Sequence, residues 1–296
     1  MAKLLEGKPL SEKIKEEIRQ QVSSLKKKPV LASIQVGENA GASAYVKSQQ
    51  KLSESLGIEY QLHKLAQDTS ENHLIGFIQK LNTDKSVNGI IIQMPLPQQI
   101  DYKEISQYIL PEKDAEGMHP ANIGKIVFGT STSLSANGER SRAIGKANIL
   151  PCTPAAVMEL LKEAGVDLYG KEVVIVGHSE IVGKPLALLL LEKFATVTVC
   201  HIGTSKAGKL EEHVMKAEVL IVAVGKAGLI KGEWIKEGAI VIDVGINRVG
   251  DKIVGDVEFE TAEKRASYIT PVPGGVGPLT VTMLMRNVVE AAKLQQ

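Results

Sequence analysis

One stretch of the sequence, residues 171–185, has the composition of a phosphate-binding turn. Residues 172–176 form a short apolar, β-branched run that predicts a strand buried on both faces. The strand ends at Gly177, a second glycine follows at Gly183, and an apolar helical pattern comes next. Such a unit presents free backbone N–H groups and the positive end of a helix dipole to an anion, as the pyrophosphate of a dinucleotide requires. An ordinary buried turn is the alternative, because Ser179 stands where the usual second glycine would be.

Alternating helices and strands surround this stretch and position its residues. Apolar periodicity predicts helices at 10–25, 43–56, 73–81, 154–164 and 279–294, and strands at 30–36, 58–65, 88–94, 196–201, 218–224 and 239–244. Ser43 is the expected N-cap of the second helix. The series implies parallel strands with right-handed crossovers, so we expect the α/β class. Residues 129–148 interrupt it with a polar stretch that we expect to be mobile.

Length and charge exclude several classes of protein. A chain of 296 residues is long for one domain and comfortable for two. The net charge of +1 gives no electrostatic footprint for a nucleic acid or a membrane surface. No apolar leader or membrane-length run occurs, and the two cysteines are too few for a disulfide framework or a zinc site. We therefore expect a cytoplasmic protein that binds no metal, no nucleic acid and no membrane.

Several separate motifs together resemble one family. In chain order they are Tyr45-Val46 with Lys51, QMPLP at 93–97, PEKDAEG at 111–117, PCTP at 151–154, the turn 177–185, and PVPGGVGPLT at 271–280. This set resembles the bifunctional methylenetetrahydrofolate dehydrogenase/methenyltetrahydrofolate cyclohydrolase family from about Gly7 to Asn287. Members of that family oxidise 5,10-methylenetetrahydrofolate by hydride transfer, and most of them then hydrolyse the methenyl product to 10-formyltetrahydrofolate.

The resemblance implies an architecture and a cellular role. We expect two α/β domains flanking a cleft: a folate-binding domain over 1–122, with helix 280–296 packing back on it, and a Rossmann-like cofactor domain over 123–279. A homodimer and a role in one-carbon metabolism and purine biosynthesis are also implied.

The sequence departs from the family pattern at Gln49. The family's key helix carries Y-V-x-x-K-x-K, with its first lysine as the central catalytic group, and Gln49 occupies that position. Residues four apart share a helix face, so Gln49 lies beside Tyr45, whereas Lys47 and Lys51 lie about 200° and 240° round the helix. Glutamine cannot exchange a proton near neutral pH. Hydride transfer needs alignment more than a base, but hydrolysis needs proton transfer. We therefore expect impaired hydrolysis, by a natural or an engineered change.

A second departure is Glu116, where the family has the aspartate expected to hold the pterin ring. Its extra methylene either moves the ring by roughly an ångström or is a tolerated change in a loop. The resemblance assigns Tyr45, Gln49, Gln93 and Glu116 to catalysis. Substrate binding is assigned to Tyr45, Gln93, Asp114, Glu116, Pro273, Gly274 and Gly275. Asp114 has a loop-capping role as its alternative, and a tight turn is the alternative for the glycines.

The expected cofactor is NAD or NADP, with NAD favoured. The family residues that suit a ribose 2′-phosphate are arginine and serine, and His178 and Ile202 replace them here. Lys206 or Lys209 could still reach a phosphate, although loop lysines are usually only solvated. The cofactor-binding residues implied by the resemblance are Gly177, His178, Ser179, Ile181, Gly183, Thr204, Ile246 and Gly277.

Two other functions are compatible with the same sequence. One is a full bifunctional dehydrogenase/cyclohydrolase that tolerates Gln49, and the other is a catalytically silent paralogue that binds folate.

Overall fold

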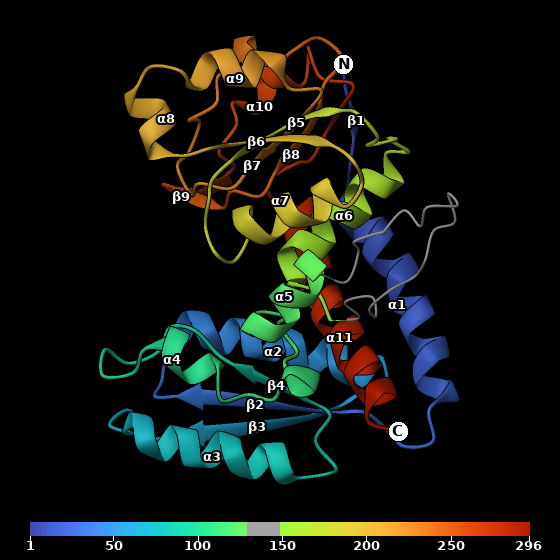
Figure 1. The fold of residues 1–296 in the computed structure, drawn as a ribbon, viewed down its shortest axis with the longest axis vertical. Coiled ribbons are helices and arrows are strands. Elements are labelled where there is room, and N and C mark those ends of the chain that lie inside the picture. The colour runs from blue at the N-terminus through green and yellow to red at the C-terminus, as the bar shows by residue number, and fades with distance from the viewer. Residues whose placement is uncertain (129–148) are drawn as a thin grey trace, which may run out of the picture. The chain divides into compact units, whose positions relative to one another are not determined.

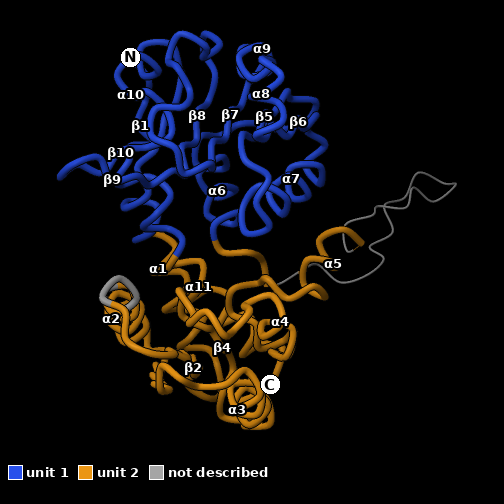
Figure 2. The backbone as a smooth tube through the Cα atoms, turned by 90° about the vertical axis from the view of Figure 1, so that its left-hand side faces the viewer, with its two compact units in different colours: residues 1–12, 153–280 blue, residues 13–152, 281–296 orange. Residues whose placement is uncertain are grey.

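The computed structural model describes residues 1–128 and 149–296, so the predicted polar stretch 129–148 lies outside the described residues. The described chain forms two compact units (Figure 2). Unit 1 comprises Met1–Glu12 and Thr153–Thr280, and unit 2 comprises Lys13–Cys152 and Val281–Gln296. Each unit is built on a parallel sheet, which confirms the predicted α/β class with two domains.

The compact units differ from the predicted domain limits at the N-terminus and after residue 122, because the described residues 123–128 and 149–152 belong to unit 2. The prediction placed all of 1–122 in one domain, but β1 (Lys3–Leu4) pairs in parallel with β11 (Tyr268–Ile269) and belongs to unit 1. Strands of two residues are too short to show a period-two pattern in the sequence. The limits of a folate-binding and a cofactor-binding domain stay predictions, as does the expected cleft.

Unit 2 contains a three-stranded parallel sheet in the order β3-β2-β4 (Figure 1). Its elements are β2 (Val30–Val36), β3 (Glu59–Leu65), β4 (Gly89–Ile92), α2 (Ala40–Ser55), α3 (Glu71–Thr83), α4 (Tyr102–Ser106), a 3-10 turn (Pro111–Lys113) and α5 (Pro120–Phe128). Alternate residues of β2, including Ala32 and Ile34, share a buried core with residues of α3 and α4. Ser33 therefore faces the other side of the sheet, toward the side chain of Gln93.

Two long helices, α1 (Gly7–Ser24) and α11 (Val276–Leu294), each begin in unit 1 and end in unit 2. The apolar stripe of α1 is buried as its 3.6-residue periodicity predicts, with Ile14 and Ile18 at 3% and 1% exposure. Beyond the end of α11, the side chain of Gln295 donates to the backbone carbonyl of Asn88 (2.8 Å). Gln295 thus connects the segment after α11 to the residue that precedes β4.

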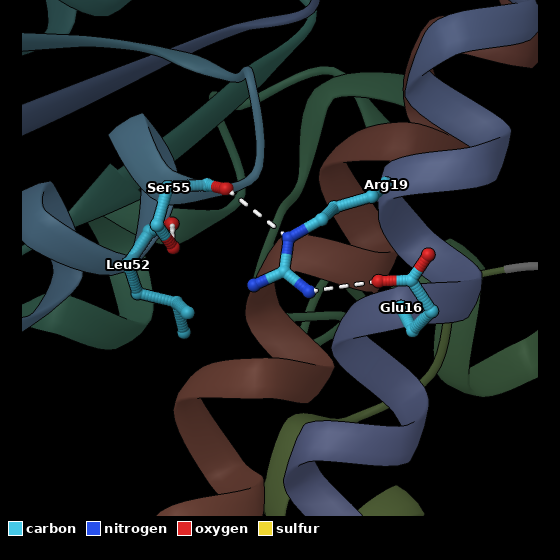
Figure 3. Close-up of polar contacts among 4 residues, drawn as sticks. All are labelled: Glu16, Arg19, Leu52 and Ser55. Atoms are coloured by element: carbon cyan, nitrogen blue, oxygen red, sulfur yellow. Dashed lines mark hydrogen bonds and ion pairs between the residues drawn. The ribbon is translucent and has the colours of Figure 1, made fainter.

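Helix α2 is fixed at its C-terminal end by an arginine of α1 (Figure 3). Arg19 Nε donates to the carbonyl oxygen of Ser55 (3.3 Å), while its guanidinium also pairs with Glu16 on its own helix (3.0 Å). The last carbonyls of a helix lack partners within the helix, so this contact satisfies one of them with a cation. Because α2 carries Tyr45 and Gln49, Arg19 helps to set the position of these two side chains.

The prediction of Ser43 as the N-cap of α2 is wrong. The helix begins at Ala40, and the Ser43 hydroxyl donates to the carbonyl of Asn39 (2.9 Å) from within the first turn. Serine makes this backward hydrogen bond inside a helix as readily as it caps one, so its residue type alone does not locate the start.

Unit 1 contains a six-stranded parallel sheet in the order β1-β11-β8-β7-β5-β6. Its further elements are α6 (Cys152–Glu163), β5 (Glu172–Val176), α7 (Gly183–Leu191), β6 (Thr196–Cys200), α8 (Ile202–Lys206), α9 (Leu210–Lys216), β7 (Val219–Val222), a 3-10 turn (Gly232–Trp234), β8 (Ile240–Asp243) and α10 (Phe259–Ala262). An antiparallel pair, β9 (Asn247–Val249) and β10 (Lys252–Val254), was not predicted. Strand order reverses between β5 and β7, where open α/β sheets bind ligands.

Within the described ranges, none of the helices combines the length and apolar character that a membrane span requires.

Candidate active site

The first group of predicted site residues lies in unit 2 around Gln49. This side chain is fully buried, and its Oε1 accepts hydrogen bonds from Gln93 Nε2 (2.8 Å) and Tyr60 Oη (3.0 Å). Gln93 Nε2 also donates to Ser33 Oγ (3.0 Å). The structure therefore brings Gln49 and Gln93 together from α2 and from the end of β4. Every group in these contacts is neutral near pH 7.

The amide nitrogen of Gln49 has no hydrogen-bond partner in the described part of the chain, although it is buried. A buried N–H group without an acceptor is costly, so this nitrogen is available to donate to a bound molecule. Tyr45 lies one helical turn before it with an exposed fraction of 41%, and burial of its hydroxyl raises the pKa of Tyr45 to about 12. Lys47 and Lys51 are exposed, as their helical positions predict.

Glu116 is one of the two acidic residues among the predicted site residues of unit 2. Tyr102 Oη donates to Glu116 Oε2 (2.8 Å). Burial raises the pKa of Glu116 to about 7; the Tyr102 hydrogen bond opposes this rise, and the negative charge of Asp114 adds to it. Glu116 is thus a carboxyl group that changes its charge near neutral pH.

The Asp114 carboxylate points toward its own loop and forms hydrogen bonds there. The residue is 4% exposed and accepts hydrogen bonds from His119 N (2.7 Å), Gly117 N (3.1 Å) and Asn122 Nδ2 (3.1 Å). These contacts favour the loop-capping alternative over substrate binding, because both carboxylate oxygens already have internal donors. By shaping this loop, Asp114 sets the direction of Glu116, two residues later.

Sequence reasoning missed Asn287 of α11. Its Nδ2 donates to the carbonyls of Leu150 (2.7 Å) and Ala115 (2.9 Å) and lies 3.6 Å from Cys152 Sγ. Burial raises the pKa of the Cys152 thiol well above its usual value, and the nearby Glu116 carboxylate adds to the rise, so this cysteine is a packing residue near neutral pH. Asn287 was missed, as were Tyr60 and Tyr102, because each meets its partners through the fold and none stands in a motif.

The second group lies in unit 1 at the predicted phosphate-binding turn. A Cβ atom on Gly177 would overlap the Ala223 carbonyl, and one on Gly183 would overlap the Gly177 carbonyl, so neither position admits a larger residue. Gly177 also has a φ of 124°. Ser179 Oγ accepts from Val182 N (3.2 Å), and the serine therefore stabilises the turn where a glycine is usual.

A cavity of about 350 Å³ adjoins this turn at the carboxyl ends of β5, β6 and β7. Of the predicted cofactor-binding residues, Gly177, His178 and Ser179 line it, together with His201, Ile202, Val224 and Lys226. The others do not line it: Ile181, Gly183, Thr204, Ile246 and Gly277. Lys206 and Lys209 are also absent from its wall, so Lys226 is the lysine in the described chain that reaches this cavity.

His178 and His201 form a pair of imidazoles at the cavity, with ring centroids 5.1 Å apart. His201 is the N-cap of α8: its Nδ1 accepts from Gly203 N (3.1 Å), and its backbone N–H donates to Thr204 Oγ1 (3.2 Å). The His201 side chain is exposed. Thr204 serves this capping box, which leaves its role in cofactor binding a prediction.

The glycine-rich turn at 271–280 packs against the start of α1. Gly7 N donates to the Gly274 carbonyl (2.8 Å), and a Cβ on Gly7 would overlap the Gly275 carbonyl. A Cβ on Gly275 would lie 2.7 Å from Thr270 Cβ. Tight packing within unit 1 thus accounts for Gly275, whereas contact of Pro273, Gly274 and Gly275 with substrate stays a prediction.

Comparison with known proteins identifies the family that this chain resembles. Residues 5–116 match the tetrahydrofolate dehydrogenase/cyclohydrolase catalytic domain, and residues 151–296 match the NAD(P)-binding domain of the same family. The bifunctional protein FolD of Geotalea uraniireducens is 51% identical over 297 residues, which are 99% of each chain.

Solved structures agree with this similarity. The FolD methylenetetrahydrofolate dehydrogenase/cyclohydrolase of Campylobacter jejuni is 44% identical over the full length of both chains, with a TM-score of 0.90. The Trypanosoma brucei enzyme, solved with NADP and an inhibitor, is 37% identical over 99% of this chain and 98% of its own, with a TM-score of 0.87.

Proposed function

The chain belongs to the tetrahydrofolate dehydrogenase/cyclohydrolase family, and on that basis we propose that it oxidises 5,10-methylenetetrahydrofolate to 5,10-methenyltetrahydrofolate with NAD, while its hydrolysis of the methenyl product is impaired. One observation carries the second half of this proposal. Gln49 is buried in a network of neutral groups, Tyr60, Gln93 and Ser33, at the position where the family's lysine is expected.

Hydride transfer depends on how two bound carbons are aligned, and the nicotinamide supplies the electron sink when it is bound. In this proposal the turn from Gly177 to Gly183 holds the dinucleotide, and Glu116 with the unpartnered amide of Gln49 holds the pterin. None of these tasks requires Gln49 to exchange a proton. Hydrolysis of the methenyl product requires a group that accepts a proton from water, and an amide does not do this.

The side chains that line the cavity support our proposal that the protein prefers NAD over NADP. Ile202 is 66% exposed beside the cavity and has no polar side-chain atom to offer a ribose 2′-phosphate, and the His178 imidazole lacks the planar set of N–H donors that an arginine would offer. Lys226 also lines the cavity and is the cation best placed to support NADP.

Hydrolysis at full rate is the second candidate function, because relatives such as the Geotalea protein are named bifunctional. Steady-state assays of the two steps, with NAD and NADP compared, distinguish the candidates. We expect NAD-linked dehydrogenation with a higher kcat/KM than NADP-linked dehydrogenation. A chain that binds folate but catalyses neither step would instead be a silent paralogue.

Three further properties belong to this proposal: a homodimer, a cytoplasmic location, and the supply of one-carbon units for purine biosynthesis. We also propose that its partners are small molecules, since the net charge of +1 gives no reason for nucleic-acid binding.

The charge of Glu116 should make folate binding depend on pH. Its carboxylate is the form that accepts hydrogen bonds from a pterin, and burial raises its pKa to about 7. As the pH falls through this value the ionised fraction falls, by about tenfold per unit well below the pKa. We therefore expect the KM for methylenetetrahydrofolate to rise as the pH is lowered from about 8 to about 6.

The control for this prediction is Glu116→Gln, which keeps the size of the side chain and removes its titration. The variant should bind folate weakly at every pH in this range. An unchanged pH profile in Glu116→Gln would show that another group causes the dependence.

A further inference from the structure

A fully buried aspartate in unit 1 organises backbone that the dinucleotide cavity uses. Asp256 is 0% exposed, and its carboxylate accepts hydrogen bonds from three successive backbone N–H groups: Val224 (2.7 Å), Gly225 (3.0 Å) and Lys226 (2.8 Å). Successive N–H groups that converge in this way form an anion-binding concavity. Here the anion is a side chain of the protein itself, so these donors are not free for a phosphate of the cofactor.

The same carboxylate also fixes the segment after β8. Asn247 Nδ2 donates to Asp256 Oδ1 (2.8 Å), and Gly245 lies so close that a Cβ atom there would overlap the Asp256 carboxylate. Asp243, the last residue of β8, in turn accepts from the backbone N–H of Asp256 (3.1 Å) and of Val257 (2.9 Å). Asp243 therefore fixes the position of Asp256, and Asp256 in turn fixes the loop that follows β7 and the segment that follows β8.

Both the loop after β7 and the segment after β8 follow the carboxyl ends of parallel strands, the side of the sheet on which the cofactor is expected. Val224 and Lys226 line the cavity beside the phosphate-binding turn, and the carbonyl of Ala223 packs against Gly177. A shift of the segment from Val224 to Lys226 would change the shape of the cavity wall. It would also change the packing of the Ala223 carbonyl against Gly177 in the phosphate-binding turn.

We propose that Asp256 is a positioning residue for dinucleotide binding: its carboxylate fixes the backbone of Val224, Gly225 and Lys226 so that they form one wall of the cavity. This inference rests on the proposed use of that cavity by NAD or NADP. Asp256 acts through the loop that it holds and makes no contact of its own with the cofactor.

Removal of the carboxylate leaves the backbone N–H groups of Val224, Gly225 and Lys226 without the acceptor that fixes them, so the loop loses the contacts that hold its shape. In Asp256→Ala a small space replaces the carboxylate, and formate is an anion of matching chemistry that can enter it. Asp256→Asn keeps the size of the side chain but replaces one accepting oxygen with a donor, so at least one of the loop contacts is lost.

The experiment is a direct titration of each folded protein with NAD and with NADP in the absence of folate, followed by KM and kcat for the dehydrogenase step. We expect Asp256→Ala to bind the dinucleotide about tenfold more weakly or worse, and Asp256→Asn to be intermediate, because a misplacement of about 1 Å at a site can cost up to about 10²-fold. Formate should restore part of the affinity of Asp256→Ala. The KM for folate should change little.

Val257→Ala is the matched control, since Val257 is the next residue, is 5% exposed and packs in the core of unit 1. It should lower stability without weakening dinucleotide binding. Equal affinity in Asp256→Ala and the unmodified protein would overturn the inference, and so would an equal loss in Val257→Ala. An unmodified protein that bound neither dinucleotide would overturn the proposed function and the inference with it.

Discussion

Gln49→Lys should raise the rate of methenyltetrahydrofolate hydrolysis by about 10²–10⁴-fold, the usual contribution of a positioned proton-transfer group. The substitution places an amine among Tyr60, Gln93 and Tyr45, where the unmodified chain has an amide that accepts two hydrogen bonds. A lysine in such buried surroundings has a lowered pKa and exchanges protons near neutral pH. Dehydrogenase turnover should change much less, because hydride transfer uses alignment and not a base.

Gln50→Lys is the matched control for this gain. Gln50 is the next residue of α2, is exposed, and bonds to Glu54 (3.0 Å), so a lysine there adds the same charge to the same helix outside the site. It should leave hydrolysis unchanged. A gain of both activities together in Gln49→Lys would assign the lysine to folate orientation, and an unmodified protein as fast as Gln49→Lys would refute the predicted impairment.

His178→Arg combined with Ile202→Ser should raise the ratio of kcat/KM for NADP to that for NAD by about 10- to 100-fold, the value of one or two charge-assisted hydrogen bonds. Both residues line the cavity of unit 1. A guanidinium offers a planar pair of donors to a phosphate, and the serine hydroxyl offers a further donor.

The control is His178→Gln with Ile202→Ser, which supplies neutral donors without the guanidinium charge and should give a smaller change. The gain should also shrink at high salt, since the added interaction is electrostatic. A kcat/KM with NADP that equals or exceeds that with NAD in the unmodified protein would show that the proposed NAD preference is wrong.

The elements with strong local patterns were predictable from the sequence. The strand 172–176 and the strand 30–36 were predicted with the bounds that the structure has, because unbroken apolar runs between turn signals have few alternatives. Residues four apart on one helix share a face whatever the fold, so the pairing of Gln49 with the Tyr45 side of α2 followed from spacing alone.

Contacts that depend on topology were not predictable. Asn287 meets Ala115 across 172 positions of the chain, and Asp256 meets Val224 across 32. Neither residue stands in a motif whose chemistry is visible locally. The strand pair β1–β11 was missed for the same reason, because two residues near the N-terminus and two that precede α11 form strands only when they pair.

The most direct test of the proposed function supplies the unmodified protein with methylenetetrahydrofolate and NAD and follows three species over time: NADH, methenyltetrahydrofolate and 10-formyltetrahydrofolate. We expect NADH and the methenyl compound to accumulate in equal amounts, while the formyl compound forms no faster than from methenyltetrahydrofolate in buffer alone. Formation of 10-formyltetrahydrofolate in step with NADH would contradict this expectation.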